Sequence, residues 1–163
     1  MKERPDKDHY YLNISREVAR RSTCLRRGFG AVIVKNDQII STGYAGAARG
    51  AKNCTDIGVC LRQQANIPPG ERYELCRSVH AEMNAIIHAA RSEMIDSVLY
   101  LVGLDAETGE VISGARPCKI CTRLIINAGI KTVKVLEPDS GVTVYDVLDF
   151  VHNEELDLNK ARG

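Results

Sequence analysis

The sequence predicts a single α/β domain in which helices cover a mixed β-sheet, and three observations lead to this fold class. Segments with helical periodicity alternate with short β-branched runs, the 163 residues fit one ordinary domain, and no internal repeat interrupts them. Hydrophobic residues make up 44% of the chain and charged residues 26%, which is typical of a globular protein. We expect one domain over 1–163, with a core over about 10–152 and a polar C-terminal tail over about 153–163.

The N-terminal part of the chain predicts one helix, then a strand, a turn and a second strand. Over residues 10–21, apolar side chains fall at helical spacing, with arginines and a glutamate on the other side. The runs 30–34 and 39–43 are apolar and β-branched, and the polar segment 35–38 separates them. This pattern indicates a β-hairpin.

Residues 44–79 follow without a helical or strand period. The segment holds several glycines, a Pro68-Pro69-Gly70 turn and three of the six cysteines. An irregular stretch of this length is uncommon inside a compact domain. We therefore expect it to be functional or to be held in place by bound groups.

The next elements are a helix, a strand and a long connection. Residues 80–91 are rich in helix formers, and 97–102 have the composition of a buried strand. A polar, glycine-containing connection then runs from 103 to 116. The sequence leaves three roles open for it: a cap over the site, a subunit contact or a solvated hairpin.

The C-terminal part predicts a helix, a strand and a last helix. Pro117 stands at a helix start, residues 118–128 carry the helical pattern, and Gly129 is placed to end that helix. Residues 132–136 are a short strand, and 139–151 predict the last helix.

Charge and composition exclude several classes of protein. The 22 basic and 21 acidic side chains leave a formal net charge of +1, so no polyanion-binding surface is evident and we expect no nucleic-acid partner. No apolar run approaches the ~20 residues that cross a bilayer, and the charged N-terminus has no signal-peptide pattern. We expect a cytoplasmic protein without a membrane partner, whose cysteines are metal ligands or free thiols.

Two short segments carry the chemistry. His80-Ala81-Glu82 opens one predicted helix and Pro117-Cys118-Lys119-Ile120-Cys121 opens another. Cys118 and Cys121 are three residues apart, so both sulfurs can face one ion, and a helix N-terminus favours the thiolate form. His80 supplies a third ligand, which leaves the fourth position of a zinc ion open, as in catalytic sites.

Glu82 is the expected catalytic residue of this site. A zinc ion with an open position makes water nucleophilic at neutral pH, and Glu82 can move the protons without binding the metal. Each motif alone has an ordinary alternative: a C-x-x-C pair can be a redox pair or half a structural zinc site, and a lone histidine at a helix start is usually polar surface. Both motifs in this order match the signature of the zinc deaminases.

At these residues the sequence resembles the cytidine/deoxycytidylate deaminase superfamily, and within it the deoxycytidylate (dCMP) deaminases. The resemblance extends over roughly residues 10–136 and is carried by the blocks 21–24, 30–34, 39–44, 80–86, 117–118 and 125–130. It implies a three-layer cytidine deaminase-like fold with a mixed five-stranded sheet between helices. It also implies hydrolysis of the nucleotide dCMP to dUMP and ammonia, which supplies thymidylate precursor, and assembly into homo-oligomers, often hexamers.

The resemblance has departures that concern the substrate. The family's glycine-tyrosine-asparagine-glycine motif is here Gly43-Tyr44-Ala45-Gly46, and Ala48 replaces the expected proline. The lost amide bears on the sugar contact, on allosteric control by dCTP and dTTP, or on both.

A nucleotide phosphate needs basic donors, and arginine is the usual choice. Tyr44 is a candidate for packing on the base or sugar. The alternative for the arginines is a solvated basic face, and for the tyrosine a cover over the core. The candidate phosphate ligands are Arg26, Arg27, Arg49 and Arg77.

Four further cysteines predict a second, structural zinc: Cys24, Cys54, Cys60 and Cys76. Four thiolates suit one tetrahedral ion, which would close several loops and order the irregular segment. Some dCMP deaminases that this sequence resembles carry such a zinc in this region. The alternative is a set of free, partly buried thiols.

Other functions remain open at this point. A tRNA adenosine deaminase uses the same zinc ligands but is disfavoured by the neutral charge, and deamination of cytidine, cytosine or guanine is a further alternative. A catalytically silent zinc-stabilised binding module could dispense with Glu82, which is present here. A thiol redox protein would use Cys118 and Cys121 and hold no metal.

Overall fold

The computed structural model, which describes residues 3–161, contains the five-stranded mixed sheet that the sequence resemblance implies. Its strands are β1 (Arg27–Lys35), β2 (Gln38–Tyr44), β5 (Val98–Asp105), β6 (Thr132–Leu136) and β7 (Val142–Asp146). They are ordered β2-β1-β5-β6-β7; β5 and β6 run parallel and the other neighbours antiparallel. The α/β fold class and the expected hairpin are confirmed.

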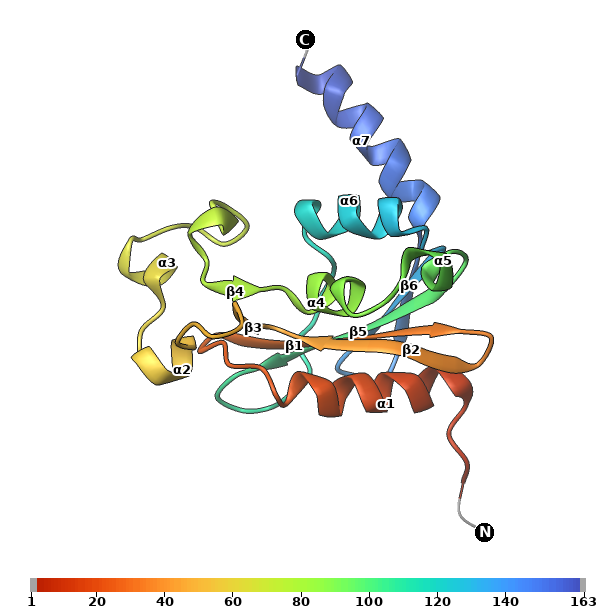
Figure 1. Ribbon diagram of the computed structural model, residues 1–163, viewed down its shortest axis with the longest axis horizontal. Coiled ribbons are helices and arrows are strands. Elements are labelled where there is room, and N and C mark those ends of the chain that lie inside the picture. Colours follow the sequence, from red (N-terminus) through yellow and green to blue (C-terminus); the bar gives the residue numbers. More distant parts are fainter. Residues whose placement is uncertain (1–2, 162–163) are drawn as a thin grey trace.

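Helices cover both faces of the sheet and make three layers (Figure 1). α1 (Lys7–Ala19) lies along one face, against β1 and β5. α4 (Ala81–Ile87) and α6 (Lys119–Ala128) lie on the other face and contact each other. α7 (Val147–Ala161) packs against α6 and projects beyond the sheet.

The central strand β1 shows how the two apolar layers are divided. Ala31 and Ile33 belong to the core beneath α4 and α6, whereas Val32 and Val34 belong to the core beneath α1. Successive strand residues point to opposite faces, and both faces are covered. This is why residues 30–34 are a continuous apolar run instead of an alternating one.

Glycines let the helices approach the sheet closely. A Cβ at Gly30 would lie 2.3 Å from the carbonyl oxygen of Ser15, so α1 could not sit where it does over a larger residue. Gly43 allows the same approach for α4 on the opposite face. The position of α4 matters because His80 and Glu82 lie at its start.

The irregular segment between β2 and α4 contains only short elements. They are β3 (Gly46–Ala47), α2 (Cys54–Ile57), α3 (Leu61–Gln64), the 3₁₀ turn η1 (Tyr73–Leu75) and β4 (Ser78–Val79). β3 and β4 pair with each other as a separate two-stranded sheet. The part with α2 and α3 extends beyond the end of the main sheet (Figure 1).

Two expected helices are wrong in part. The helix expected at 139–151 is instead the edge strand β7 followed by α7, because Val142, Thr143 and Val144 are β-branched and pair with β6. The helix expected at 80–91 ends at Ile87, and a second short helix, α5 (Arg91–Met94), follows Ala90, whose backbone is extended.

The expected polar tail at 153–163 is helical as far as Ala161; residues 162–163 lie outside the described residues. In this part of the helix Lys119 and Arg123 of α6 form ion pairs with Asp157 and Glu154. Within residues 3–161, no helix combines the length and apolar character that crossing a membrane requires.

Candidate active site

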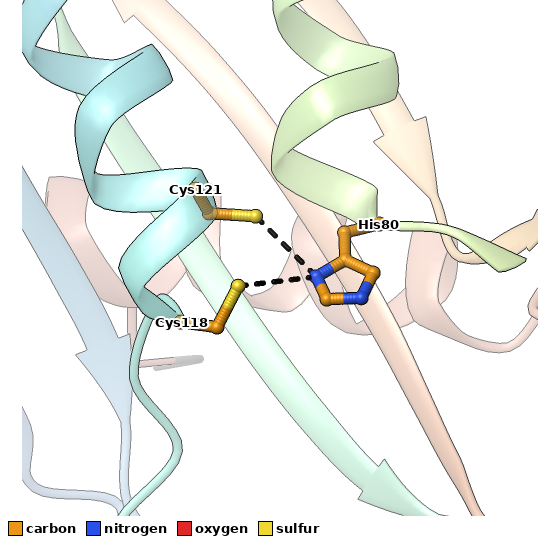
Figure 2. Close-up of side chains that lie close together, drawn as sticks. All are labelled: His80, Cys118 and Cys121. Atoms are coloured by element: carbon orange, nitrogen blue, oxygen red, sulfur yellow. Dashed lines mark hydrogen bonds between the residues drawn. The ribbon is translucent and has the colours of Figure 1, made fainter. Parts of the chain in front are cut away.

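The N-termini of α4 and α6 meet on one face of the sheet and bring the two sequence motifs together. His80 is the N-cap residue of α4 and follows β4 directly. Cys118 is the N-cap residue of α6, and Cys121 lies in its first turn. Figure 2 shows both sulfurs directed toward the imidazole of His80.

The geometry of these three side chains fits a zinc ion. The Nδ1 atom of His80 lies 3.5 Å from the sulfur of Cys118 and 3.4 Å from that of Cys121. Tetrahedral zinc with ordinary bond lengths separates a nitrogen and a sulfur ligand by about 3.6 Å. Among the residues that the structure describes, this is the one group of three or more possible ligands whose donor atoms all lie within 4.8 Å of one another.

The electrostatics of the two cysteines favour a thiolate at the site. A hydrogen bond from Cys121, together with one from His80, lowers the pKa of Cys118 to about 4. The hydrogen bond with Cys118 and burial raise the pKa of Cys121. The two cysteines together thus hold one thiolate, which is the form of cysteine that binds a metal cation.

Glu82 lies one residue inside α4 and is buried, with an exposed fraction of 4%. Burial raises the pKa of its carboxyl group, and no lysine or arginine pairs with it among the described residues. An unpaired buried carboxyl group beside possible metal ligands is typical of a catalytic acid or base.

These residues open onto a large cavity of about 930 Å³. His80, Glu82 and Cys118 line it, together with seven basic side chains and three further acidic ones: Arg26, Arg27, Arg62, Arg72, Arg116, Lys119 and Lys160, and Glu74, Glu154 and Asp157. Arg72 pairs with Glu74 and Lys119 with Asp157, so the other basic residues account for the excess of positive charge. The volume is in the range of cavities that hold small organic molecules. A basic wall suits an anionic group on such a molecule.

The other candidate substrate residues lie elsewhere. Tyr44 and Arg49 do not line this cavity; Tyr44 is 37% exposed, with the Arg21 guanidinium 5.8 Å from its ring centroid. Arg77 donates to the carbonyl oxygen of Lys52 and lines a different cavity. Ala45, which replaces the family's asparagine, is buried in the cavity wall.

The 103–116 connection contributes to the site at one end only. Its tip is an exposed turn in which Asp105 accepts hydrogen bonds from the backbone of Glu107 and Thr108. Gly114, Ala115 and Arg116, at the other end, line the cavity. In this chain the connection is an exposed hairpin whose far end lines the cavity wall.

The four remaining cysteines come together in the irregular segment. Cys24, Cys54, Cys60 and Cys76 line one small cavity of about 10 Å³, and all are free thiols. Burial, with the three neighbouring thiols, raises the pKa of Cys54. Their sulfur atoms are farther apart than those of the His80 cluster, since no three of them meet the 4.8 Å spacing within the described chain.

Sequence reasoning missed much of the cavity wall, and Arg62, Tyr73 and Arg116 are among the residues it did not indicate. Arg62 and Tyr73 lie in the segment without periodicity, so no pattern indicated which way they point. Arg116 stands directly before Pro117. Its closeness in sequence to the cysteine motif was the one signal that could have indicated it.

Comparison with known proteins is consistent with this geometry. The sequence model of the cytidine and deoxycytidylate deaminase zinc-binding region matches residues 5–137. The chain is 36% identical over 135 residues to a deoxycytidylate deaminase of Mycobacterium phage D29, covering 80% of this chain and 94% of that protein. It is 34% identical over 131 residues to the deoxycytidylate deaminase of Schizosaccharomyces pombe, covering 80% of this chain and 37% of that longer protein.

A solved structure has the same fold. The crystal structure of the apo form of a dCMP deaminase from cyanophage S-TIM5 superposes with a TM-score of 0.57 and 25% identity, and the match covers 83% of this chain and 86% of that one. The family model spans most of the chain, and both motif segments lie inside it. The chain belongs to the cytidine and deoxycytidylate deaminase family of zinc-binding enzymes.

Proposed function

We propose that the protein is a dCMP deaminase that hydrolyses dCMP to dUMP and ammonia with one catalytic zinc held by His80, Cys118 and Cys121. The observation that carries this proposal is the buried, unpaired Glu82 carboxyl group next to the three ligands, in the wall of a basic cavity. The relatives from phage D29 and S. pombe, both named deoxycytidylate deaminases, support the choice of substrate.

Glu82 moves the protons of the reaction. When bound, zinc supplies the Lewis acidity that makes a water molecule nucleophilic at neutral pH. Glu82 takes a proton from that water as it attacks C4 of the cytosine ring and delivers the proton to ring N3. It then transfers the second water proton to the amino group, which leaves as ammonia, and C4 becomes the carbonyl of uracil.

Two basic residues of the cavity lining serve the 5′-phosphate. Arg26 and Arg27 line the cavity together with His80 and Glu82, so we propose them as phosphate ligands. The buried Ala45 in the same wall presents a methyl group where the family has an amide. Tyr44 and Arg49 lie off the cavity and are assigned no substrate contact.

An ammonia-release assay of the zinc-loaded protein tests the substrate. The panel is dCMP, CMP, deoxycytidine, dCTP, cytosine, guanine and a tRNA anticodon stem-loop. We expect dCMP to be turned over best, with deoxycytidine much poorer because it lacks the phosphate. Faster turnover of a free base, a nucleoside or the tRNA would assign the cavity to that substrate instead.

Glu82→Gln tests the mechanism. The amide keeps the size of the side chain but cannot accept and return a proton, so we expect kcat to fall by roughly 10²- to 10⁴-fold. The zinc content by atomic absorption and the melting temperature should stay as in the wild type. Turnover that survives this substitution would remove Glu82 from the mechanism.

We further propose a second, structural zinc at Cys24, Cys54, Cys60 and Cys76. The shared cavity and the buried position of Cys54 support it, because small motions would bring four thiolates to one ion. Cys54→Ser should lower the zinc content from two ions per chain to one and speed proteolysis between Cys54 and Cys76. The exposed neighbour Thr55 provides the control Thr55→Ala, and one zinc ion in both variants and in the wild type would contradict the proposal.

We also propose that the protein is a homo-oligomer. Large apolar side chains are exposed on β7 and α7: Val144, Leu148, Val151, Leu156 and Leu158. Large apolar side chains exposed on neighbouring elements are typical of association sites. Light scattering after size exclusion should give a mass that is a multiple of 18.0 kDa, and a monomer at micromolar concentration would contradict this.

A further inference from the structure

Three side chains stack in series in the wall of the large cavity, ending at the proposed zinc ligand His80. The Cζ atom of Arg62 lies over the ring of Tyr73, 4.7 Å from its centroid. The Tyr73 ring meets the His80 imidazole edge to face, with centroids 5.1 Å apart and the planes at 88°. All three residues line the cavity.

Arg62 is buried and hydrogen-bonded although it lies in an irregular segment. Its exposed fraction is 6%, and Nη2 donates to the carbonyl oxygens of Pro68 (3.1 Å) and Glu71 (2.6 Å). A planar guanidinium can bond backbone carbonyls at its edge and stack on a ring with its face. Arg62 thereby links the turn at residues 68–71 to the ring of Tyr73.

His80 lacks the partner that usually orients a metal-bound histidine. Such a histidine nearly always donates its second ring N–H to a carboxylate or a backbone carbonyl. The hydrogen bonds of the His80 ring run from Nδ1 to Cys118 and Cys121, and within residues 3–161 no protein group bonds Nε2. The edge-to-face contact with the Tyr73 ring is therefore in a position to restrict the rotation of the imidazole.

We infer that Tyr73 is a positioning residue that holds the His80 imidazole with Nδ1 toward the two sulfurs, and that Arg62 holds Tyr73 in place. The inference rests on the proposed zinc site but not on the identity of the substrate. It assigns the irregular segment a role in the active site: α3 and η1 supply the packing that a hydrogen-bonded carboxylate supplies in other zinc sites. The hydroxyl group of Tyr73 forms no hydrogen bond with the described residues, so the aromatic ring is the part that acts.

The zinc affinity of the His80 site tests this inference without any assay of deamination. Purified zinc-loaded protein is titrated with a chromophoric chelator, and His80→Ala protein, which lacks this site, identifies the step that belongs to it. Tyr73→Leu should weaken zinc binding in that step by about 10- to 100-fold, the usual effect of losing an outer partner of a metal ligand. Tyr73→Phe, which keeps the ring, should bind zinc as the wild type does.

The matched control for tyrosine loss is Tyr10→Leu. Tyr10 is an exposed tyrosine on α1 that packs edge to face on Tyr11, on the other side of the sheet. It should leave the zinc titration unchanged. Equal zinc affinities of Tyr73→Leu and the wild type, or an equal loss in Tyr73→Phe and Tyr73→Leu, would overturn the inference.

Arg62→Met tests whether the two residues act in series. Its zinc affinity should fall in the same range as that of Tyr73→Leu, and the double variant should be no weaker than Tyr73→Leu alone, because both act through one imidazole. If the losses of zinc-binding free energy in the two single variants added up in the double variant, Arg62 and Tyr73 would act independently. This result would overturn the inference that Arg62 acts through Tyr73. If dCMP were not the substrate, the proposed function would fail, while these zinc affinities would still decide the inference.

Discussion

Gly43 determines how closely the helix with His80 and Glu82 approaches the sheet. A Cβ at this position would lie 2.3 Å from the backbone nitrogen of Ala85 and 2.4 Å from the carbonyl oxygen of Ala81. Both are backbone atoms and cannot rotate away. The helix that carries Glu82 can therefore lie this close to β2 only because residue 43 has no side chain.

Gly43→Ala should destabilise the protein by about 1–3 kcal/mol or more, the cost of an overpacked contact, because α4 has to move. The moved helix should also lower kcat. Gly109→Ala is the control: Gly109 has a positive φ but no neighbour within 4 Å, so only backbone strain of about 1–2 kcal/mol applies. Urea unfolding measures both, and a smaller loss in Gly43→Ala than in Gly109→Ala would contradict the argument.

At the scale of elements, the helix α7 shows what local pattern can and cannot indicate. The sequence predicts one helix over 139–151. The segment 142–146, which begins with three β-branched residues, becomes a strand because it pairs with the edge of β6, and this cause is tertiary. Past residue 153 the helix forms its ion pairs with α6, which is likewise a partner distant in the sequence.

Apolar packing and ion pairs both hold α7 against the rest of the domain. We expect their contributions to the free energy of unfolding to differ greatly. Phe150 is 5% exposed and packs in the core with Tyr145, whereas Arg123 and Glu154 pair at 3.2 Å on the surface. Phe150→Ala should cost about 3–5 kcal/mol of unfolding free energy. Glu154→Gln should cost less than about 1 kcal/mol. Thermal or urea unfolding that ranks them the other way would show that the ion pairs hold the helix.

For the whole molecule, the sequence indicates what depends on local pattern and misses what depends on distant contacts. The fold class, the hairpin and the ligand motifs follow from periodicity and from residue chemistry at fixed spacing. The cavity wall does not, because Arg62 and Tyr73 reach His80 through turns that have no period. Tyr44 and Arg49 were expected near the substrate on sequence proximity to the glycine motif, but the chain directs them away from the cavity.

His9 joins two distant parts of the molecule in a pH-dependent way. Its Nδ1 lies 2.9 Å from both carboxylate oxygens of Asp6, and its Nε2 lies 2.8 Å from the carbonyl oxygen of Ser140 in the β6–β7 loop. Acceptors at both ring nitrogens favour the imidazolium. The bond to Ser140, followed by that to Asp6, raises the pKa of His9 above 6.5.

A raised pKa in the folded state means that protonated His9 stabilises the fold. This contribution is complete below pH 6.5, the unfolded value, and is lost as the pH rises through the higher folded value. The melting temperature of the wild type should therefore fall over this range more than that of His9→Gln. His152→Gln, at an exposed histidine of α7, should follow the wild type, and parallel curves for all three proteins would exclude the role of His9.

The strand order has a consequence for synthesis on the ribosome. β1 pairs with β2 on one edge and with β5 on the other. The hairpin of β1 and β2 can close early, but the second edge of β1 stays open until β5, about seventy residues later, has emerged. During that interval Val32, Ile33 and Val34 are exposed beside unpaired backbone groups, which is the arrangement that aggregates. The synthesis of residues 36–105 is thus the interval in which the open edge of β1 can pair with another chain.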